Sequence, residues 1–418
     1  MRDKINFLHI HTTDTRGGAA ISAYRFHKAL LEHGYGSHIL CGRKYSFGDD
    51  VTPIVPGKYG WAFNKIVGRF FNNLGLQSFG YPSSFFMRFS KWIKEWADVV
   101  ILRNLHGWYF SIGTLPSIAK YVPIIWRLPD MWALTGHCAY SYDCQRWKIG
   151  CGSCPYLNIY PEIPFDTTHF FWLRKKKIYQ KIKNRLVFVS PSKWLKRLVD
   201  ESQLTKDFRC EYIPTGIDLN IFKPGLREES RKILGIQEHE KVIMFSAENL
   251  RDKRKGLDTF FEVVKELKKK IKFPITLLLV GCRGERFDFS QDIKLIKIGF
   301  TEEDKFLSVC YNVCDVYLCL SKADNLPNTL VEASACGVPI VTLDNGGCVE
   351  TLENGRSGYV VRNISEIIEA VRNILHDDSK NKEFSINARA LAEKKFSMEN
   401  QVNAYVKLAG ELLDLCKE

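Results

Sequence analysis

Residues 321–340 read SKADNLPNTLVEASACGVPI, a strand end followed by a polar turn, a short helix and a second strand. The polar turn predicts that the chain leaves a sheet here, and the helix is expected from about Asn328 to Cys336. Along the rest of the chain, short runs rich in Val, Ile and Leu alternate with amphipathic segments of helix length. This alternation predicts the α/β class, with mostly parallel sheets covered by helices on both faces.

Eleven strands are expected, in two groups. In the first half of the chain they are Ile5–His11, His38–Cys41, Asp98–Arg103, Val122–Trp126 and Leu186–Val189. In the second half they are Lys241–Ala247, Ile275–Gly281, Ile293–Ile298, Val316–Leu320, Pro339–Leu343 and Gly358–Val361. Each group could form its own doubly wound, Rossmann-like domain, and 418 residues are comfortable for two such cores.

The boundary between the two groups falls at residues 213–226, IPTGIDLNIFKPGL. Two prolines and two glycines lie close together there, which is typical of a linker. We therefore expect domains at 1–212 and 213–397, followed by a C-terminal helix in 398–418. The apolar residues of that helix follow the spacing of one buried face, so it could pack on either domain, including back on the first.

The composition is that of a globular protein with a basic surface. Hydrophobic residues make up 45% of the chain, and the formal net charge is +13. No apolar run reaches the ~18 residues of a membrane span, and the N-terminus lacks the apolar core of a signal peptide, so the chain is expected to be cytoplasmic. The charge suits phosphorylated ligands, anionic lipid headgroups or nucleic acid, or it serves solubility alone.

A cluster of basic residues lies in the run 247–256, AENLRDKRKG, between an expected strand and a helix that begins near Leu257. Lysine and arginine side chains beside the N–H groups of a helix start suit a diphosphate. A clamp for phosphates and a solvated basic loop fit this pattern equally well. The basic residues are Arg251, Lys253, Arg254 and Lys255.

The stretch 321–340 also offers carboxylates and backbone N–H groups at a helix entrance. Asp324 and Glu332 are separated by seven residues. N–H groups there can hold phosphate oxygens, and a carboxylate one turn into the helix can accept from ribose hydroxyls. An ordinary capped helix, with Glu332 as a solvated charge, is the alternative. Gly346 and Gly347, in the run DNGGCVE, would let backbone approach a ligand closely.

Taken in order, these motifs resemble those of the retaining GT-B glycosyltransferases, of the glycosyltransferase family 4-like type found in bacterial surface-polysaccharide synthesis. The linker motif of that family is similar to Ile213–Asp218, its basic turn ends like Lys255–Gly256, and its GGxxE loop is similar to Gly346–Glu350. Its E-x(7)-E motif and the EAxAxGxPVV-like run after it are matched from Asp324 through Val341, and Val189–Leu195 is also similar. The resemblance covers nearly the whole chain and implies the GT-B fold, in which two Rossmann-like domains face each other across a cleft.

The resemblance implies that 213–397 is the domain that binds a nucleoside-diphosphate sugar. Lys255, with Arg251 or Arg254, would contact the diphosphate, and Glu332 would bind the ribose. Asp324 stands where the family has its first glutamate, and AENL stands where the family often has an arginine in a GRL-like context. The residues implied in donor binding are Gly17, Gly18, Arg251, Arg254, Lys255, Asp324, Asn325, Leu326, Pro327, Asn328, Thr329, Glu332, Gly346 and Gly347.

The resemblance also implies that 1–212 binds the acceptor. Related enzymes carry an HD pair near the acceptor, but here Pro129 takes the histidine position, so Asp130 lacks that neighbour. His106 or His137 could substitute, and each could equally be structural. The predicted reaction moves a sugar to a lipid-linked or oligosaccharide acceptor with retention of anomeric configuration. The candidate catalytic residues are Asp130, His106, His137, Lys255 and Asp324.

Four of the thirteen cysteines gather in the segment 138–154. Thiolates at this spacing could hold a structural zinc ion, and the C-x-x-C end supports it. The other spacings are not those of a standard zinc ribbon, so free thiols fit as well, and a disulfide fits less well. The four are Cys138, Cys144, Cys151 and Cys154. Catalysis is expected to need no cofactor, because no DxD-like acidic pair follows a strand.

Residues 58–96, from Lys58 to Trp96, form an insertion in which aromatic and basic side chains interleave. Residues 170–199 add ten Lys or Arg and no acidic residue. This composition favours contact with the headgroups of an anionic membrane over an inserted pair of helices with exposed lysines. We therefore expect peripheral attachment at the inner face of the plasma membrane.

Other functions are compatible with parts of the sequence. A nucleotide-sugar epimerase of the same architecture would need neither an acceptor nor a membrane-facing surface. A nucleic-acid-binding protein would explain the charge, but the sequence shows no helix-turn-helix, zinc-finger or RNA-recognition pattern, so no nucleic-acid partner is expected. A non-catalytic sugar-nucleotide binder is suggested by the departures at Asp324 and Pro129.

Overall fold

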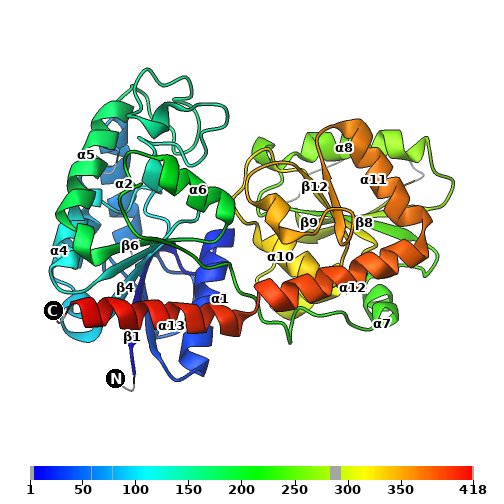
Figure 1. The fold of residues 1–418 in the computed structure, drawn as a ribbon, viewed down its shortest axis with the longest axis horizontal. Coiled ribbons are helices and arrows are strands. Elements are labelled where there is room, and N and C mark those ends of the chain that lie inside the picture. Colours follow the sequence, from blue (N-terminus) through cyan, green and yellow to red (C-terminus); the bar gives the residue numbers. More distant parts are fainter. Residues whose placement is uncertain (1–3, 58, 78, 283–292, 417–418) are drawn as a thin grey trace. The chain divides into compact units, whose positions relative to one another are not determined.

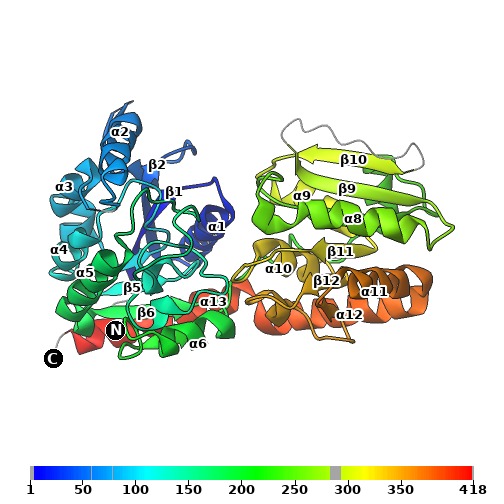
Figure 2. The same cartoon turned by 90° about the horizontal axis from the view of Figure 1, so that it is seen from above.

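The structure, a computed structural model, describes residues 4–57, 59–77, 79–282 and 293–416. The chain folds into two compact units, which can be followed in Figures 1 and 2. Unit 1 comprises Met1–Pro214 and Gln401–Glu418, and unit 2 comprises Thr215–Asn400. The chain therefore passes from one unit to the other after Pro214 and again after Asn400.

Unit 1 is built on a seven-stranded parallel sheet in the order β3-β2-β1-β4-β5-β6-β7. Its central strands are buried along their whole length, as expected for a sheet that helices cover on both faces. The strands are β1 (Asn6–Thr13), β2 (Gly36–Arg43), β3 (Val51–Pro53), β4 (Val99–Leu102), β5 (Ile124–Arg127), β6 (Leu186–Ser190) and β7 (Cys210–Tyr212).

One helix of unit 1, α6, begins at a side-chain cap. Ser192 accepts a hydrogen bond from the N–H of Leu195 at 3.0 Å and so caps α6. Tyr405, on the C-terminal helix, packs on Phe26 of α1 with ring centroids 4.7 Å apart. The helices are α1 (Gly18–Glu32), α2 (Gly60–Asn73), α3 (Pro82–Arg88), α4 (Leu115–Ala119), α5 (Thr168–Lys181), α6 (Lys193–Glu201) and most of α13 (Met398–Leu415).

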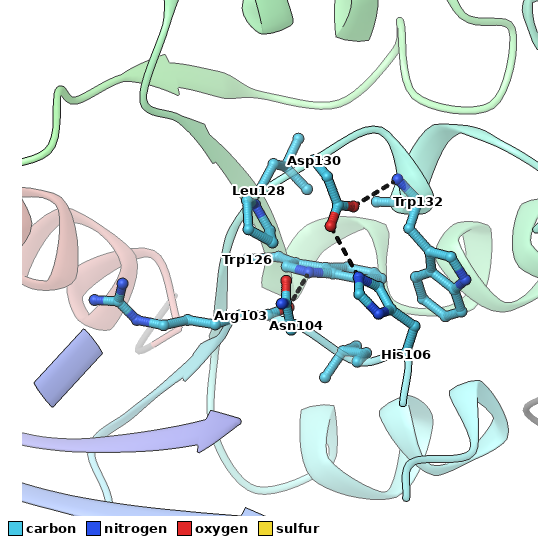
Figure 3. A pocket seen from close by; sticks show the side chains of 10 residues that line it. Arg103, Asn104, His106, Trp126, Leu128, Asp130 and Trp132 are labelled. Atoms are coloured by element: carbon cyan, nitrogen blue, oxygen red, sulfur yellow. Dashed lines mark hydrogen bonds and ion pairs between the residues drawn. The ribbon is translucent and has the colours of Figure 1, made fainter. Parts of the chain in front are cut away.

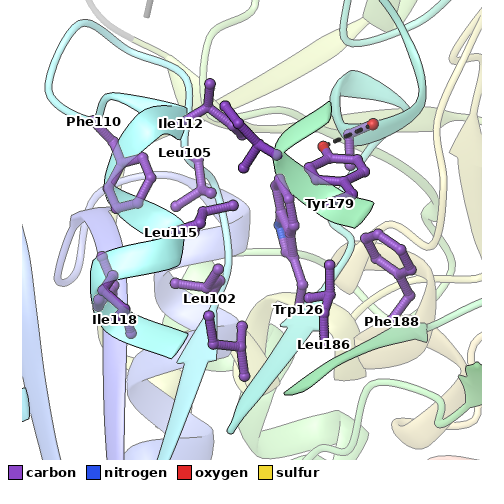
Figure 4. Close-up of a cluster of buried hydrophobic side chains, with 14 of the residues drawn as sticks. Leu102, Leu105, Phe110, Ile112, Leu115, Ile118, Trp126, Tyr179, Leu186 and Phe188 are labelled. Carbon is purple, nitrogen blue, oxygen red and sulfur yellow. Dashed lines mark hydrogen bonds between the residues drawn. The ribbon is translucent and has the colours of Figure 1, made fainter. Parts of the chain in front are cut away.

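A large cluster of buried apolar side chains covers one face of this sheet (Figure 4). Trp126 of β5 lies at its centre, with its ring centroid 5.7 Å from that of Tyr179 and 5.8 Å from that of Phe188. The indole N–H of Trp126 donates to the carbonyl of Arg103 at 3.1 Å. The cluster thereby fixes β4 and β5, whose carboxyl ends lead to the loops that carry His106 and Asp130.

Unit 2 is built on a six-stranded parallel sheet in the order β10-β9-β8-β11-β12-β13. Two apolar clusters form its core, with the side chains of β8 divided between them. The strands are β8 (Lys241–Ser246), β9 (Ile275–Cys282), β10 (Lys294–Gly299), β11 (Val316–Cys319), β12 (Ile340–Leu343) and β13 (Gly358–Val361). The helices are α7 (Arg227–Leu234), α8 (Leu257–Lys268), α9 (Asp304–Asn312), α10 (Asn328–Ala335), α11 (Ile364–His376) and α12 (Asp378–Lys395).

The structure confirms the α/β class and contains a strand at each of the eleven expected positions. Two short strands, β3 and β7, were not expected. Each has three residues and lies at an edge of its sheet, and β7 is only partly buried, so neither leaves an apolar run in the sequence. Lys58, the first residue of the expected insertion, lies outside the described residues.

Candidate active site

The basic turn predicted from the sequence lies at the carboxyl end of β8. Its residues Lys253–Lys255 form one turn of 3-10 helix, and Asp252 caps that turn by accepting from the N–H of Arg254 at 2.9 Å. Gly256 then adopts a positive φ of 81°, and a side chain there would collide with the carbonyl oxygen of Leu320. Glycine at this position therefore lets the basic turn lie directly against the end of β11.

Lys255 and Arg254 converge on the carboxylate of Asp324. The distance from Lys255 Nζ to Asp324 Oδ2 is 2.5 Å, and from Arg254 Nη1 to the same oxygen it is 3.1 Å. Burial alone would raise the pKa of Asp324, but Lys255 and Arg254 lower it to about 2. The carboxylate is therefore ionised at neutral pH, and it gathers two cations at the carboxyl edge of the unit 2 sheet.

The loop that carries Asp324 is held by its backbone. Arg254 Nη1 also donates to the carbonyl of Ala323 at 2.8 Å, and Gly347 N donates to the carbonyl of Asp324 at 3.2 Å. Gly346 has a φ of 60°, and a side chain there would collide with the same carbonyl oxygen. The structure thus brings the two predicted glycines and the predicted aspartate together.

Glu332 is buried on α10, not solvated. Its Oε2 accepts a hydrogen bond from the hydroxyl of Tyr311, on α9, at 2.8 Å. Tyr311 was not predicted as a site residue, because it lies 21 residues earlier and in an ordinary amphipathic helix. Only the packing of α9 against α10 makes it the partner of Glu332.

The other predicted donor residues divide into two groups. Asn325 and Leu326 are buried at the entrance of α10, Pro327 precedes the first turn of that helix, and Asn328 and Thr329 begin it. Arg251 is exposed, and its N–H donates to Asn249 Oδ1 at 3.1 Å. Of the two arginines that the sequence left open, Arg254 shares Asp324 with Lys255.

In unit 1, His106 and Asp130 line one small pocket at the ends of β4 and β5 (Figure 3). His106 Nε2 lies 2.8 Å from Asp130 Oδ2, and both side chains are buried. The second carboxylate oxygen accepts from the N–H of Trp132 at 2.9 Å, and His106 Nδ1 lies 3.2 Å from the hydroxyl of Tyr160. Asp130 therefore lacks a histidine beside it in the sequence but contacts His106 in the folded protein.

The alternative histidine, His137, has different surroundings. Its Nδ1 lies 2.9 Å from the carbonyl of Pro161, and its Nε2 lies 3.5 Å from Cys154 Sγ. Burial lowers its pKa, so the ring is neutral at pH 7. These contacts are those of a histidine that holds loops together. In the first loop, Gly17 is the N-cap of α1 and Gly18 is the first residue of that helix.

Lys175 supports the Asp130 loop and was not predicted. This fully buried residue of α5 donates from Nζ to the carbonyls of Trp132 and Thr135, at 2.5 and 2.9 Å, and lies 3.5 Å from the centroid of the Trp132 ring. In the sequence it is one of three consecutive lysines, so nothing there distinguishes it from its solvated neighbours.

None of the four clustered cysteines takes part in a disulfide. Burial, together with the neighbouring thiols, raises the pKa of Cys138 to about 12, and burial raises that of Cys151 to about 11. Within the described ranges, no three His, Cys, Asp or Glu side chains converge closely enough to hold a metal ion. A structural zinc site at Cys138, Cys144, Cys151 and Cys154 stays a prediction.

Residues 227–391, which include Lys255, Asp324 and Glu332, match the family model described as glycosyl transferases group 1. Unit 2 contains a group 1 glycosyltransferase domain. The whole chain is similar to the putative colanic acid biosynthesis glycosyl transferase WcaC of Escherichia coli K12, at 26% identity over 97% of this chain and 100% of that protein.

Two solved structures show the same fold as this chain. Sucrose-phosphate synthase from Thermosynechococcus elongatus superposes with a TM-score of 0.71 at 15% identity, over 98% of this chain and 99% of that chain. Anabaena HepE, solved in complex with UDP-glucose, gives a TM-score of 0.61 at 14% identity, over 97% and 99% of the two chains. The fold of the chain is GT-B, as predicted.

Proposed function

We propose that this glycosyltransferase moves a sugar from a nucleoside-diphosphate sugar to a hydroxyl of a lipid-linked or oligosaccharide acceptor, with retention of anomeric configuration, in surface-polysaccharide synthesis. The observation that carries the proposal is the convergence of Lys255 and Arg254 on Asp324 at the strand ends of the group 1 domain. The UDP-glucose complex of HepE and the colanic acid role in the name of WcaC support the donor class and the pathway class.

Lys255 and Arg254 would bind the donor diphosphate. A bound diphosphate would compete with Asp324 for the same two cations, because both are anionic oxygen ligands. Glu332 would accept from the ribose, since a carboxylate has about four acceptor positions. We propose the adjoining residues 325–329 and the glycine pair 346–347 as the rest of the donor site.

The chemistry needs charge stabilisation at the leaving group. The bond between the sugar C1 and the diphosphate oxygen breaks, the acceptor oxygen bonds to C1, and the hydroxyl proton passes to the departing diphosphate. Positive charge from Lys255 and Arg254 would stabilise that diphosphate as it leaves. The proposal therefore assigns this role to protein cations and not to a catalytic metal ion.

His106 and Asp130 would hold the acceptor. The 2.8 Å contact of His106 Nε2 with Asp130 and the 3.2 Å contact of His106 Nδ1 with the Tyr160 hydroxyl hold the ring at both of its nitrogens. An acceptor hydroxyl would compete with the Tyr160 hydroxyl for Nδ1 of this imidazole. His137, Gly17 and Gly18 are further candidates from the sequence, and His137 has the contacts of a structural residue.

The proposed location is the inner face of the plasma membrane, with peripheral contact to anionic lipid. Among the helices of the described ranges, none combines the length and apolar character that crossing a bilayer requires. Contact would instead come from the aromatic and basic surface of unit 1, in keeping with its sequence composition.

The proposal is tested by incubating the protein with radiolabelled UDP-, GDP- and ADP-sugars, with and without a glycolipid acceptor. We expect label in the acceptor with one donor, and NMR of the product should show the anomeric configuration of the donor retained. Epimerisation of the donor without acceptor would favour the epimerase alternative and contradict the proposal, as would an inverted product.

A further inference from the structure

Helix α2 presents its large apolar side chains to solvent. Phe63, Ile66 and Phe70 are 55%, 69% and 61% exposed, and they recur every three or four residues along one side of the helix. Tyr59 and Leu74, the residues that flank the helix, are exposed and extend the same stripe. A helix of a soluble domain normally packs such a stripe against the core. In α2 the apolar stripe instead faces solvent.

The inward side of α2 shows why the helix cannot simply rotate. Its buried residues are Gly60, Asn64 and Gly68, four residues apart. A Cβ added at Gly68 would come within 2.9 Å of Trp108 Cβ. The helix therefore needs small residues on its inner face, and the aromatic stripe is fixed on the outside.

Helix α3 continues the exposed apolar surface, and Figure 2 shows α2 and α3 at the periphery of unit 1. We call the combined patch the α2–α3 surface. Large exposed apolar side chains gathered on two neighbouring helices mark an interaction site. The members of the surface are Tyr59, Phe63, Ile66, Phe70, Leu74, Phe85, Phe86 and Phe89.

The charges around the α2–α3 surface identify its partner. Residues 51–94 contain no Asp or Glu. The exposed basic residues among them are Lys65, Arg69, Arg88, Lys91 and Lys94. Glu95, next to Lys94, is the first acidic residue after this range and is exposed. Five exposed basic side chains beside aromatic and aliphatic ones suit the headgroup layer of an anionic bilayer, where the rings enter the interface and the cations meet lipid phosphates.

The same helix is bonded to the loop of the candidate acceptor pocket. Asn64 Nδ2 donates to the carbonyl of Trp108 at 2.8 Å, and Asn64 Oδ1 accepts from Ser83 N of α3 at 3.2 Å. Trp108 lies two residues after His106, which contacts Asp130. The outer side of α2 therefore faces the proposed bilayer, while its inner side fixes the loop that carries His106.

We propose that the α2–α3 surface docks on anionic lipid and holds the His106–Asp130 pocket at the headgroup layer, so that the acceptor is a lipid-anchored glycan and not a soluble oligosaccharide. The acceptor class rests on the proposed function, whereas lipid docking does not depend on it.

Docking is tested by flotation of the full chain with vesicles of phosphatidylcholine alone or mixed in equal parts with phosphatidylglycerol. The wild type should float with the mixed vesicles only, and less so as salt is raised, since salt screens exposed charges. Phe63→Ser/Phe70→Ser should weaken partitioning at least about tenfold, because two large apolar side chains no longer enter the interface. Ile386→Ser, at a residue of α12 that is 62% exposed, is the matched control and should float like the wild type.

Three outcomes of flotation would overturn lipid docking. The wild type could fail to float, the double variant could float unchanged, or sedimentation could show a dimer that the double variant abolishes, which would assign the surface to a second copy of the chain. Circular dichroism of the double variant checks its fold, which exposed substitutions should preserve.

The acceptor class is tested by comparing transfer to a glycolipid in the mixed vesicles with transfer to its water-soluble glycan. The wild type should prefer the vesicle-borne acceptor, and the double variant should lose that preference while its turnover of donor with the soluble glycan is unchanged. Equal use of both acceptors by the wild type would overturn the lipid-anchored class even if the protein floats. Absence of transfer to either acceptor would contradict the proposed function, and flotation would still report on docking.

Discussion

Replacing Asp324 by asparagine removes the negative charge that Lys255 and Arg254 share. Both cations lie within 3.1 Å of Asp324 Oδ2, and the aspartate side chain is only 11% exposed, so solvent screens the interaction incompletely. Asparagine has nearly the same shape and keeps one carbonyl oxygen. The substitution therefore isolates the contribution of the charge, and it leaves two neighbouring cations without their shared carboxylate.

The size of the effect follows from the pKa of Asp324. Although burial raises it, Lys255 and Arg254 bring it from the ordinary 3.8 to about 2. At about 1.4 kcal/mol per pKa unit, this difference corresponds to ~2 kcal/mol of folding free energy at neutral pH. Because the folded pKa lies below the unfolded one, the contribution is complete above the unfolded value of 3.8 and is lost as the pH falls through about 2.

The assay is urea unfolding of the full chain, followed by tryptophan fluorescence, for the wild type and Asp324→Asn. We expect the variant to lose ~2 kcal/mol at neutral pH, and the difference to shrink as the pH falls through the interval between 3.8 and about 2. Asp252→Asn is the control, because its carboxylate contacts Arg254 alone at 3.1 Å and is 36% exposed, so it should change stability by less than about 1 kcal/mol. Equal stability of Asp324→Asn and the wild type at neutral pH, or a difference that does not depend on pH, would refute the ion pair.

Three other predictions follow from unit 1. Arg103 is buried, and its three guanidinium nitrogens have no hydrogen-bond partner among the described residues. Because an unpaired buried charge is costly, Arg103→Met should raise the free energy of unfolding, measured in urea, by about 1–3 kcal/mol. A lower free energy of unfolding in the variant would show that the charge of Arg103 is compensated. His106→Ala and Asp130→Asn should each lower kcat at least about 100-fold without weakening donor binding, and unchanged turnover would remove this pair from the acceptor site. If the segment 138–154 holds zinc, elemental analysis should find it in the wild type and not in a variant with all four cysteines replaced by serine, whereas metal-free wild type would identify free thiols. The four are Cys138, Cys144, Cys151 and Cys154.

The strands of this fold could be predicted because they are buried on both faces. Continuous apolar runs such as Val99–Leu102 and Val316–Cys319 leave a clear signal in the sequence. The edge strands β3 and β7 could not be predicted in this way, since an edge strand needs no apolar run. The order of strands also follows only from pairing, which no single run of sequence encodes.

Those parts of the candidate site that lie within one loop could be predicted from the sequence motif of that loop. Contacts between segments that are distant in the sequence could not. Lys255 and Asp324 were each expected, but their 2.5 Å contact joins residues 69 apart in the sequence. The partner of Asp130 was open between two histidines until the ends of β4 and β5 placed His106 beside it. Tyr311 could not be found at all, because an amphipathic helix gives no sign that one of its tyrosines meets a carboxylate on the next helix.

Calorimetric titration of nucleoside-diphosphate sugars into the wild type and two lysine variants tests the central claim, a donor site built around Lys255. The wild type should bind at least one of the UDP-, GDP- or ADP-sugars, and Lys255→Ala should weaken that binding by about 10- to 100-fold, because a charge-assisted hydrogen bond to the diphosphate is lost. Lys253→Ala removes an equal charge from the same turn at an exposed residue and should bind like the wild type. Absence of binding by the wild type to every sugar nucleotide, or equal binding by Lys255→Ala, would contradict the account.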